Sequence, residues 1–310
     1  ARAEGSVPRE PGAKMLATGE RLFDTIGGGH LEYVAAATAR EMLALPAAEL
    51  AGSRRLQRIP LGPALGQCCG GVAWLAFERV DMGDAACHAH FHALRERLAR
   101  GASGLRLLSL DDAAPARLAD GPVDAQPGCT LIQQAEGGRR LEDLCAPPAA
   151  RLYLFGAGHV GAALVRALAP LPCRITWVDE REELFPSPLP ANVTAEVTDI
   201  PEAVVAEAPP GASFLVMTHS HALDQRLAEA ILRRDGVGWF GLIGSKTKRL
   251  QFERRLRERG LPAARLADMV CPIGIEGIGG KEPAVIAIAV AAQLLQVWQR
   301  QAQPDHPDHQ

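Results

Sequence analysis

The sequence lacks a surplus of positive charge, a membrane-length hydrophobic run and a regular cysteine pattern. Its 33 Lys and Arg face 36 Asp and Glu, a formal net charge of −3, so no basic face is left to neutralise the phosphates of a nucleic acid. The most apolar run, residues 284–292, is far too short to cross a bilayer, and no segment resembles a signal peptide. Seven cysteines without disulfide spacing favour reduced thiols and a cytoplasmic protein.

What remains is the composition of a globular protein of about two domains. The 310 residues are 47% hydrophobic and 22% charged, which is ordinary for soluble chains of this length. We expect an N-terminal α+β domain over residues 1–146 and a C-terminal Rossmann-like α/β domain, with a doubly wound parallel sheet, over residues 147–310. The chain opens without an initiator Met, and we expect native sequence before it.

Residues 151–180 carry the strongest pattern in the chain. A predicted strand runs into a Gly-x-Gly-x-x-Gly motif, which is followed by a helical pattern and by a second apolar strand that ends in an acid. This is the dinucleotide-binding fingerprint in its required context. Its candidate binding residues are Gly156, Gly158, His159, Gly161 and Asp179.

Each member of the fingerprint has a physical role. Gly156 permits a tight turn, Gly158 lets a pyrophosphate approach the backbone, and Gly161 allows close packing of helix on strand. The free N–H groups and dipole of the helix favour an anion, and Asp179 would accept hydrogen bonds from a ribose diol. A Rossmann scaffold with an altered pocket remains the alternative.

Beyond Asp179, strands expected at 193–197, 214–218 and 237–243 alternate with helical segments, which predicts a doubly wound parallel sheet. Ligands bind such sheets at the carboxyl ends of the strands. Lys248 and Arg249, taken singly, are expected to be surface residues. The candidates that follow strands or precede helices at that edge are His219, Ser245, Lys246, Gly280 and Lys281.

Two glycine-rich stretches mark the N-terminal domain. Gly27, Gly28 and Gly29 precede a helix expected at 30–45, and they form either an anion-binding helix start or a flexible tight turn. Cys68 and Cys69 lie between glycines, where a thiolate could contact a soft metal. The alternative is two small buried residues.

The rest of this domain is less regular. A hairpin is expected at 14–17 and 21–25, strands at 55–61 and 72–80, and a helix at 85–100. That helix would place His88 and His92 on one face, as a metal site or as solvated side chains. Apolar runs at 105–110 and 129–133 are expected to be the last strands, before a linker that ends at Pro147-Pro148.

Seven stretches in the correct order resemble the xanthine dehydrogenase accessory protein family (XdhC/CoxI). They run from Gly5 to Leu295, and Ser220 stands where relatives often carry an acid. The stretches are GSVPREPGAKML, TIGGGHLEY, GPALGQCCGG, LFGAGHVG, VMTHSHALD, GLIGSKTKR and CPIGIEGIGGKEPAVIAIAVAAQLL.

The resemblance implies a chaperone, without catalytic activity, for the molybdenum cofactor (Mo-molybdopterin). Such a protein binds and protects the cofactor, supports its sulfuration with a cysteine desulfurase and inserts it into apo xanthine dehydrogenase, alongside other proteins of cofactor biosynthesis. It also implies a homo-oligomer. The glycine-rich helix starts would hold the cofactor's phosphate, and Cys68 or Cys69 would face the molybdenum.

Two other functions stay open. An NAD(P)-dependent oxidoreductase would use the 156–161 fingerprint to bind NAD(P) or another nucleotide, although no acid–base pair accompanies the crevice in the sequence. A pure adaptor would use the Rossmann domain only as a docking surface. No nucleic-acid or membrane partner is expected.

Overall fold

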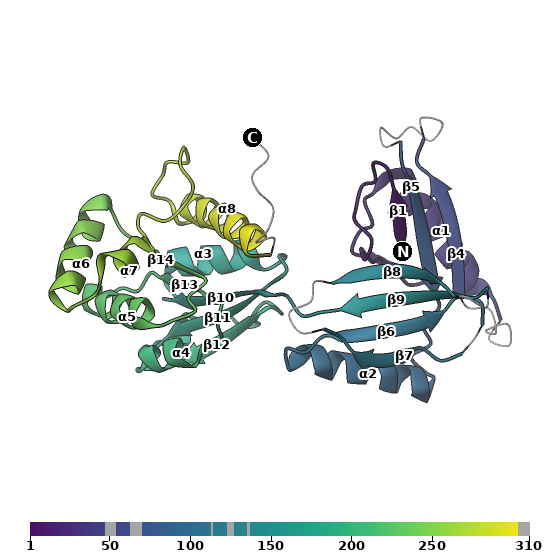
Figure 1. Ribbon diagram of the computed structural model, residues 1–310, viewed down its shortest axis with the longest axis horizontal. Helices are drawn as coiled ribbons and strands as arrows, with labels where there is room; N and C mark the ends of the chain where they lie inside the picture. The colour runs from purple at the N-terminus through teal and green to yellow at the C-terminus, as the bar shows by residue number, and fades with distance from the viewer. Residues whose placement is uncertain (47–53, 63–69, 113, 123–126, 135–136, 303–310) are drawn as a thin grey trace. The chain divides into compact units, whose positions relative to one another are not determined.

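The computed structural model describes residues 1–46, 54–62, 70–112, 114–122, 127–134 and 137–302. The chain divides into two compact units, Ala1–Pro147 and Pro148–Gln310 (Figure 1). Each unit has its own hydrophobic clusters. In the described part of the chain, no helix combines the length and the hydropathy that a bilayer crossing requires.

The first unit is built on antiparallel strands. One sheet has the order β1-β5-β4, a second has the order β7-β6-β9-β8, and β2 and β3 form a separate hairpin. The strands are β1 (Arg2–Glu4), β2 (Leu16–Ala17), β3 (Leu22–Phe23), β4 (Arg54–Pro60), β5 (Val72–Glu78), β6 (Gly104–Ser109), β7 (Arg117–Asp120), β8 (Gly128–Gln133) and β9 (Arg139–Cys145).

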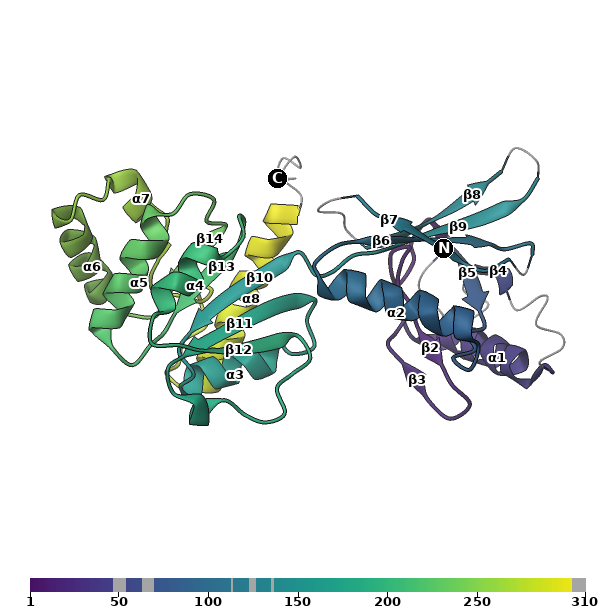
Figure 2. The same ribbon diagram turned by 90° about the horizontal axis from the view of Figure 1, so that it is seen from below.

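Two helices cover these sheets. Helix α1 (Gly29–Ala44) buries Leu31 against Ile59 of β4 and Ala73 of β5. Helix α2 (Ala85–Ala99) begins at Asp84, whose carboxylate accepts hydrogen bonds from the amides of Ala86 and Cys87, as N-cap residues do. It lies along β6 and β7 (Figure 2).

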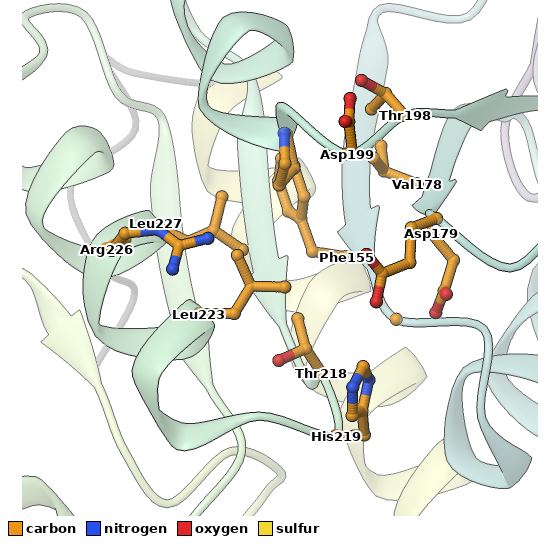
Figure 3. A pocket seen from close by; sticks show the side chains of 13 residues that line it. Phe155, Val178, Asp179, Thr198, Asp199, Thr218, His219, Leu223, Arg226 and Leu227 are labelled. Atoms are coloured by element: carbon orange, nitrogen blue, oxygen red, sulfur yellow. The ribbon is translucent and has the colours of Figure 1, made fainter.

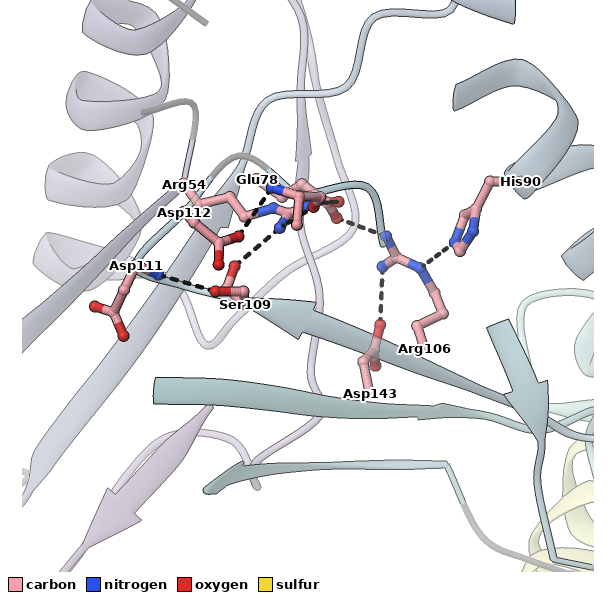
Figure 4. Close-up of polar contacts among 9 residues, drawn as sticks. Arg54, Glu78, His90, Arg106, Ser109, Asp111, Asp112 and Asp143 are labelled. Atoms are coloured by element: carbon pink, nitrogen blue, oxygen red, sulfur yellow. Dashed lines mark hydrogen bonds and ion pairs between the residues drawn. The ribbon is translucent and has the colours of Figure 1, made fainter. Parts of the chain in front are cut away.

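A buried polar network joins the two sheets of the first unit (Figure 4). Arg106 of β6 donates to Glu78 of β5 at 2.6 Å, to Asp143 of β9 at 3.1 Å and to Nε2 of His90 on α2 at 3.1 Å. Burial, and then the nearby Arg106, lower the pKa of His90. Buried charges need such partners, so these charges also fix how the two sheets pack.

The second unit contains a six-stranded parallel sheet in the order β12-β11-β10-β13-β14-β15. This is the strand order of a Rossmann sheet. The chain adds β11 and β12 on one side of β10 and then returns to add β13, β14 and β15 on its other side, so the strand order reverses between β10 and β13. The strands are β10 (Ala150–Phe155), β11 (Cys173–Asp179), β12 (Val193–Val197), β13 (Ser213–Val216), β14 (Trp239–Leu242) and β15 (Met269–Val270).

Successive residues of a strand point to opposite faces of the sheet. Apolar residues occupy both faces here, and helices cover each of them. Leu152 and Leu154 of β10 pack with α3 (His159–Leu168) and α8 (Pro283–Ala302). Phe155 packs on the other side, among residues of the remaining helices. Those helices are α4 (Pro201–Glu207), α5 (His221–Arg233), α6 (Lys246–Glu258) and α7 (Ala263–Ala267), and a short 3₁₀ helix η3 spans Glu182–Leu184.

The expected doubly wound parallel sheet is therefore confirmed. The linker expected after residue 133 is wrong over Arg139–Cys145, because β9 there pairs with both β6 and β8. Its inward positions include the buried carboxylate of Asp143, which obscures the apolar alternation of a half-buried strand.

Candidate functional site

The turn from β10 into α3 uses its glycines for different reasons. Gly156 has φ +116°, and a Cβ there would lie 2.4 Å from the carbonyl oxygen of Met217. A Cβ on Gly161 would lie 2.3 Å from the carbonyl oxygen of Gly156, whereas nothing lies within 4 Å of one on Gly158. Gly156 and Gly161 thus serve close backbone packing, and Gly158 leaves space in front of the helix.

The start of α3 has no side-chain cap. Its N-cap is Gly158, and no side chain among the described residues caps the first turn. By contrast, Ser220 caps α5 and Ser245 caps α6. Because the first N–H groups of a helix lack intrahelical partners, α3 presents free amides and the positive end of its dipole to whatever fills the space beside Gly158.

Asp179, the acid of the fingerprint, is already hydrogen-bonded within the chain. Its Oδ2 accepts from the Ala157 amide at 2.7 Å and from Nη2 of Arg181 at 2.9 Å, and its Oδ1 accepts from the amide and Nε of Arg181 at 3.1 and 2.8 Å. Burial alone would raise the pKa of Asp179, but the hydrogen bonds from Arg181 and Ala157 outweigh it and the pKa is lowered. The predicted ribose contact would require Arg181 to move away.

A pocket lies at the carboxyl ends of β10–β13, beside the point where the strand order reverses (Figure 3). Of the predicted site residues, the structure brings Gly156, Asp179 and His219 together there. Gly158 and His159 begin the adjacent α3, and both are exposed. The other lining residues are Phe155, Val178, Glu180, Thr198, Asp199, Pro201, Thr218, Leu223, Arg226 and Leu227.

A buried ion pair that the sequence analysis missed fixes the loop that carries His219. Asp224 of α5 accepts from the amide and hydroxyl of Thr218 and from Nζ of Lys248 at 2.7 Å. Lys248 also donates to the carbonyl oxygen of Ile243. The expectation that Lys248 is a surface residue is wrong, because its side chain is 12% exposed and that of Asp224 is 2% exposed.

The remaining C-terminal candidates lie at other helix starts. Ser245 accepts a hydrogen bond from the Lys248 amide at 3.2 Å, while Lys246 is exposed. Gly280 has φ +139°, and Lys281 is exposed two residues before α8. None of these four residues lines the pocket beside Asp179.

The glycine turn before α1 is filled by the chain's own carboxylate. Oε1 of Glu32 accepts from the amides of Ile26 and Gly28 at 2.9 Å each and from the hydroxyl of Thr25. The hydrogen bond from Thr25 lowers the pKa of Glu32 most, and the backbone amides lower it further. Burial has a smaller, opposite effect. All three glycines, residues 27–29, have positive φ, so this segment is a tight turn that already holds an anion.

Cys68 and Cys69 lie outside the described residues, so their contact with molybdenum stays a prediction. His88 and His92 do share one face of α2, with ring centroids 6.2 Å apart. Across the described ranges, no group of three or more His, Cys, Asp or Glu residues could hold a metal ion.

Known proteins match both units. The model of the XdhC Rossmann domain matches residues 152–294, and that of the XdhC and CoxI family matches residues 1–52. The chain belongs to the XdhC and CoxI family. Within it, the pocket and the glycine turn of α3 fall in the XdhC Rossmann domain.

Two curated relatives match about half of this XdhC-family chain. One is "Uncharacterized protein YqeB" of Escherichia coli, 32% identical over 51% of this chain and 30% of that protein. The other is a probable xanthine dehydrogenase subunit of Bacillus subtilis, 29% identical over 50% of this chain and 45% of that protein. The chain thus spans less than half the length of either relative.

A solved structure shares the whole fold. The crystal structure of a protein described as a xanthine dehydrogenase from Bacillus halodurans matches 99% of this chain and 92% of its own, with a TM-score of 0.73 and 22% identity. At that identity the likeness shows the fold alone.

Proposed function

We propose that this chain is a maturation protein for xanthine dehydrogenase that holds the molybdenum cofactor as cargo and delivers it to the apoenzyme. The family supports a maturation role, and the name of the Bacillus subtilis relative, a probable xanthine dehydrogenase subunit, points to that enzyme as the partner. Sulfuration of the cofactor with a cysteine desulfurase, contacts with other proteins of its biosynthesis and assembly as a homo-oligomer belong to the same proposal.

The observation that supports cofactor binding most directly is the uncapped start of α3. Gly158 is exposed with open space beside it, and within the described part of the chain no side chain caps the first turn. A phosphate fits such a helix start. The proposed cargo carries both a phosphate and a flat pterin ring, and a pocket of mixed apolar and polar lining lies next to this turn.

The NAD(P)-dependent oxidoreductase is less well supported. The carboxylate that would bind the ribose diol has four hydrogen bonds within the chain, three of them from Arg181. A carboxylate has about four acceptor positions, so Asp179 as it stands does not fit the ribose of an unphosphorylated dinucleotide. The geometry of this crevice therefore does not support an enzyme that transfers hydride from NAD(P).

A cofactor-retention assay tests the proposal. Purified protein is mixed with molybdenum cofactor released from a molybdoenzyme and passed through gel filtration, and the protein fraction is oxidised and assayed for the fluorescent pterin derivative. We expect about one pterin per chain, and activation of apo xanthine dehydrogenase by the same fraction. A protein fraction without pterin would refute cofactor binding.

The role of the paired cysteines is tested in the same assay. The Cys68→Ala, Cys69→Ala double variant should lose most of the retained cofactor, because thiolates suit a sulfur-ligated metal. Cys87→Ala, a half-buried cysteine on α2, serves as the matched control and should retain it. If the double variant behaves like the control, neither cysteine contacts the molybdenum.

A further inference from the structure

The pocket beside Asp179 offers both apolar and polar groups to a ligand. Apolar side chains and polar or charged side chains line it together (Figure 3). Small-molecule sites combine apolar surface that packs on a ligand with polar groups that fix its orientation. The apolar side chains come from β10, β11, α4 and α5, and they are Phe155, Val178, Pro201, Leu223 and Leu227.

Two of the pocket's charged side chains are already paired within the chain. Asp179 is bound to Arg181 and to the Ala157 amide. Arg226 donates to Glu202 at 2.7 Å. Asp179 therefore has no acceptor position left for a ligand in this conformation, and the charge of Arg226 is already met by a carboxylate, although only its Nε donates to a residue that the structure describes.

Asp199 is different, because its carboxylate has no hydrogen-bond or ion-pair partner among the residues that the structure describes. It is exposed, and it does not cap α4, whose N-cap is Ile200 without a side-chain hydrogen bond. The backbone on either side is fixed: the Thr198 amide donates to the carbonyl oxygen of Asp179, and the Ile200 amide donates to the Thr198 hydroxyl. A short side chain on fixed backbone presents its carboxylate in few directions.

Glu180 is the other unpaired carboxylate of the lining in the described part of the chain, but it is adjacent to Arg181, whose positive charge it already meets. Its longer side chain also loses more rotamer freedom when it binds. Asp199 is therefore the better placed of the two for recognition.

An ionised carboxylate only accepts hydrogen bonds, and it can accept two in parallel. Its best partner is a ring edge with two neighbouring N–H donors. A 2-amino-4-oxopyrimidine edge, found in pterins and in guanine, offers a ring N–H beside an exocyclic amino group. Adenine places its amino group beside a ring nitrogen that is itself an acceptor, which would face the second carboxylate oxygen.

We propose that this pocket binds the 2-amino-4-oxopyrimidine edge of the cargo, with Asp199 as the residue that recognises it. The inference rests on the proposed function, because the pterin of the molybdenum cofactor carries this edge. The saturated Asp179 then helps to exclude ordinary dinucleotides, since it has no free acceptor for the ribose diol.

Three probes distinguish the sources of this edge: pterin-6-carboxylate, GMP and AMP, each titrated up to millimolar concentration against the full chain, with affinity measured by fluorescence or calorimetry. We expect pterin to bind and AMP to bind at least tenfold more weakly. Asp199→Asn should weaken pterin by roughly tenfold or more, as expected for a hydrogen bond to a charged group. GMP binding that also depends on Asp199 would support recognition of the shared edge.

Glu196→Gln is the matched control, because this exposed carboxylate on β12 does not line the pocket. It should leave all affinities within twofold, and thermal unfolding should show both variants folded. Equal pterin affinity in Asp199→Asn and wild type would overturn the proposal, as would AMP binding as tight as pterin or no binding of any probe.

Retention of the whole cofactor, assayed on the same samples, separates the two proposals. If wild type and Asp199→Asn retain the cofactor equally and pterin binding is indifferent to Asp199, only the pocket assignment fails. If the wild type retains no cofactor at all, the proposed function fails with it.

Discussion

The glycine-rich starts of α1 and α3 use the same local chemistry to different ends. Before α1, the turn at residues 27–29 is closed by the carboxylate of Glu32, which accepts two amides and a hydroxyl. Before α3, Asp179 accepts the Ala157 amide of the turn and is otherwise bonded to Arg181, and no described side chain caps the helix start beyond it. The first turn is complete within the chain, and the second is not.

The difference shows what makes a helix start available to a ligand. Exposed N–H groups attract an anion, but an anion supplied by the chain itself is covalently tethered and competes at high effective concentration. Glycine content therefore does not separate the two turns. The position of the nearest carboxylate does, and the following changes test that distinction.

The largest effect should come from adding a Cβ to the glycines that pack at the second turn. Gly156→Ala and Gly161→Ala each place a Cβ within 2.4 Å of a backbone oxygen, so each should cost about 3 kcal/mol or more. Gly158→Ala meets nothing within 4 Å and should cost about 1 kcal/mol or less. Denaturant unfolding monitored by circular dichroism measures all three.

Gly158→Ala should nevertheless reduce cofactor retention, because the added methyl group occupies the space beside the free amides. Unchanged retention in a folded Gly158→Ala protein would show that the cargo does not approach this turn.

The next effect is at the first turn. Glu32→Ala should cost about 1–2 kcal/mol, because the amides of Ile26 and Gly28 lose their acceptor. It should also create an anion site, so that sulfate raises the melting temperature of the variant more than that of the wild type.

Glu41→Ala on the same helix is the control for this change, since Glu41 is largely exposed and its ion pair with Arg55 is long, at 3.5 Å. If sulfate stabilises the wild type, Glu32→Ala and Glu41→Ala by the same amount, the carboxylate of Glu32 is not what closes the turn.

A smaller effect should follow from releasing Asp179. Arg181→Ala removes the two side-chain hydrogen bonds on that carboxylate, from Nε and Nη2, and keeps the one from the backbone amide. NAD⁺ should then bind roughly fivefold more tightly through its ribose diol. Isothermal titration calorimetry measures the change. Arg226→Ala, at the same pocket but paired with Glu202, should leave the affinity unchanged, and an equal gain in both variants would point to charge alone.

The sequence predicts the second unit well because its signals are local. Apolar strands, the glycine motif and the acid at its end lie within about thirty residues, and the structure has β10, α3 and β11 in their expected places. In the first unit, β9 was missed because its buried positions include Asp143, whose partners Arg106 and Lys14 come from distant segments. A buried charge only makes sense once its partner is known.

The same limit applies to the site. The backbone roles of Gly156 and Gly161 follow from the motif, but the Arg181–Asp179 contact and the Asp224–Lys248 pair depend on tertiary geometry. Glu32 did leave a signal, because a carboxylate one turn into a helix can reach back to the N-cap amide. The ligand role of each predicted residue stays a prediction.

The smallest expected effect is on the pH dependence of stability, to which the carboxylates of Glu32 and Asp179 both contribute. The pKa values of Glu32 and Asp179 are both lowered in the folded protein, so each contributes stability that is fully present above the ordinary carboxyl pKa of about 4 and is lost as the pH falls through the lowered value. Unfolding free energies measured between neutral pH and the acid limit of folding should therefore decline less steeply for Glu32→Ala than for the wild type. The Glu41→Ala curve should keep the wild-type slope. Parallel curves for all three proteins would mean that the amides before α1 hold Glu32 no more tightly in its ionised form than in its neutral form, and the contrast between the two helix starts would then have no electrostatic basis.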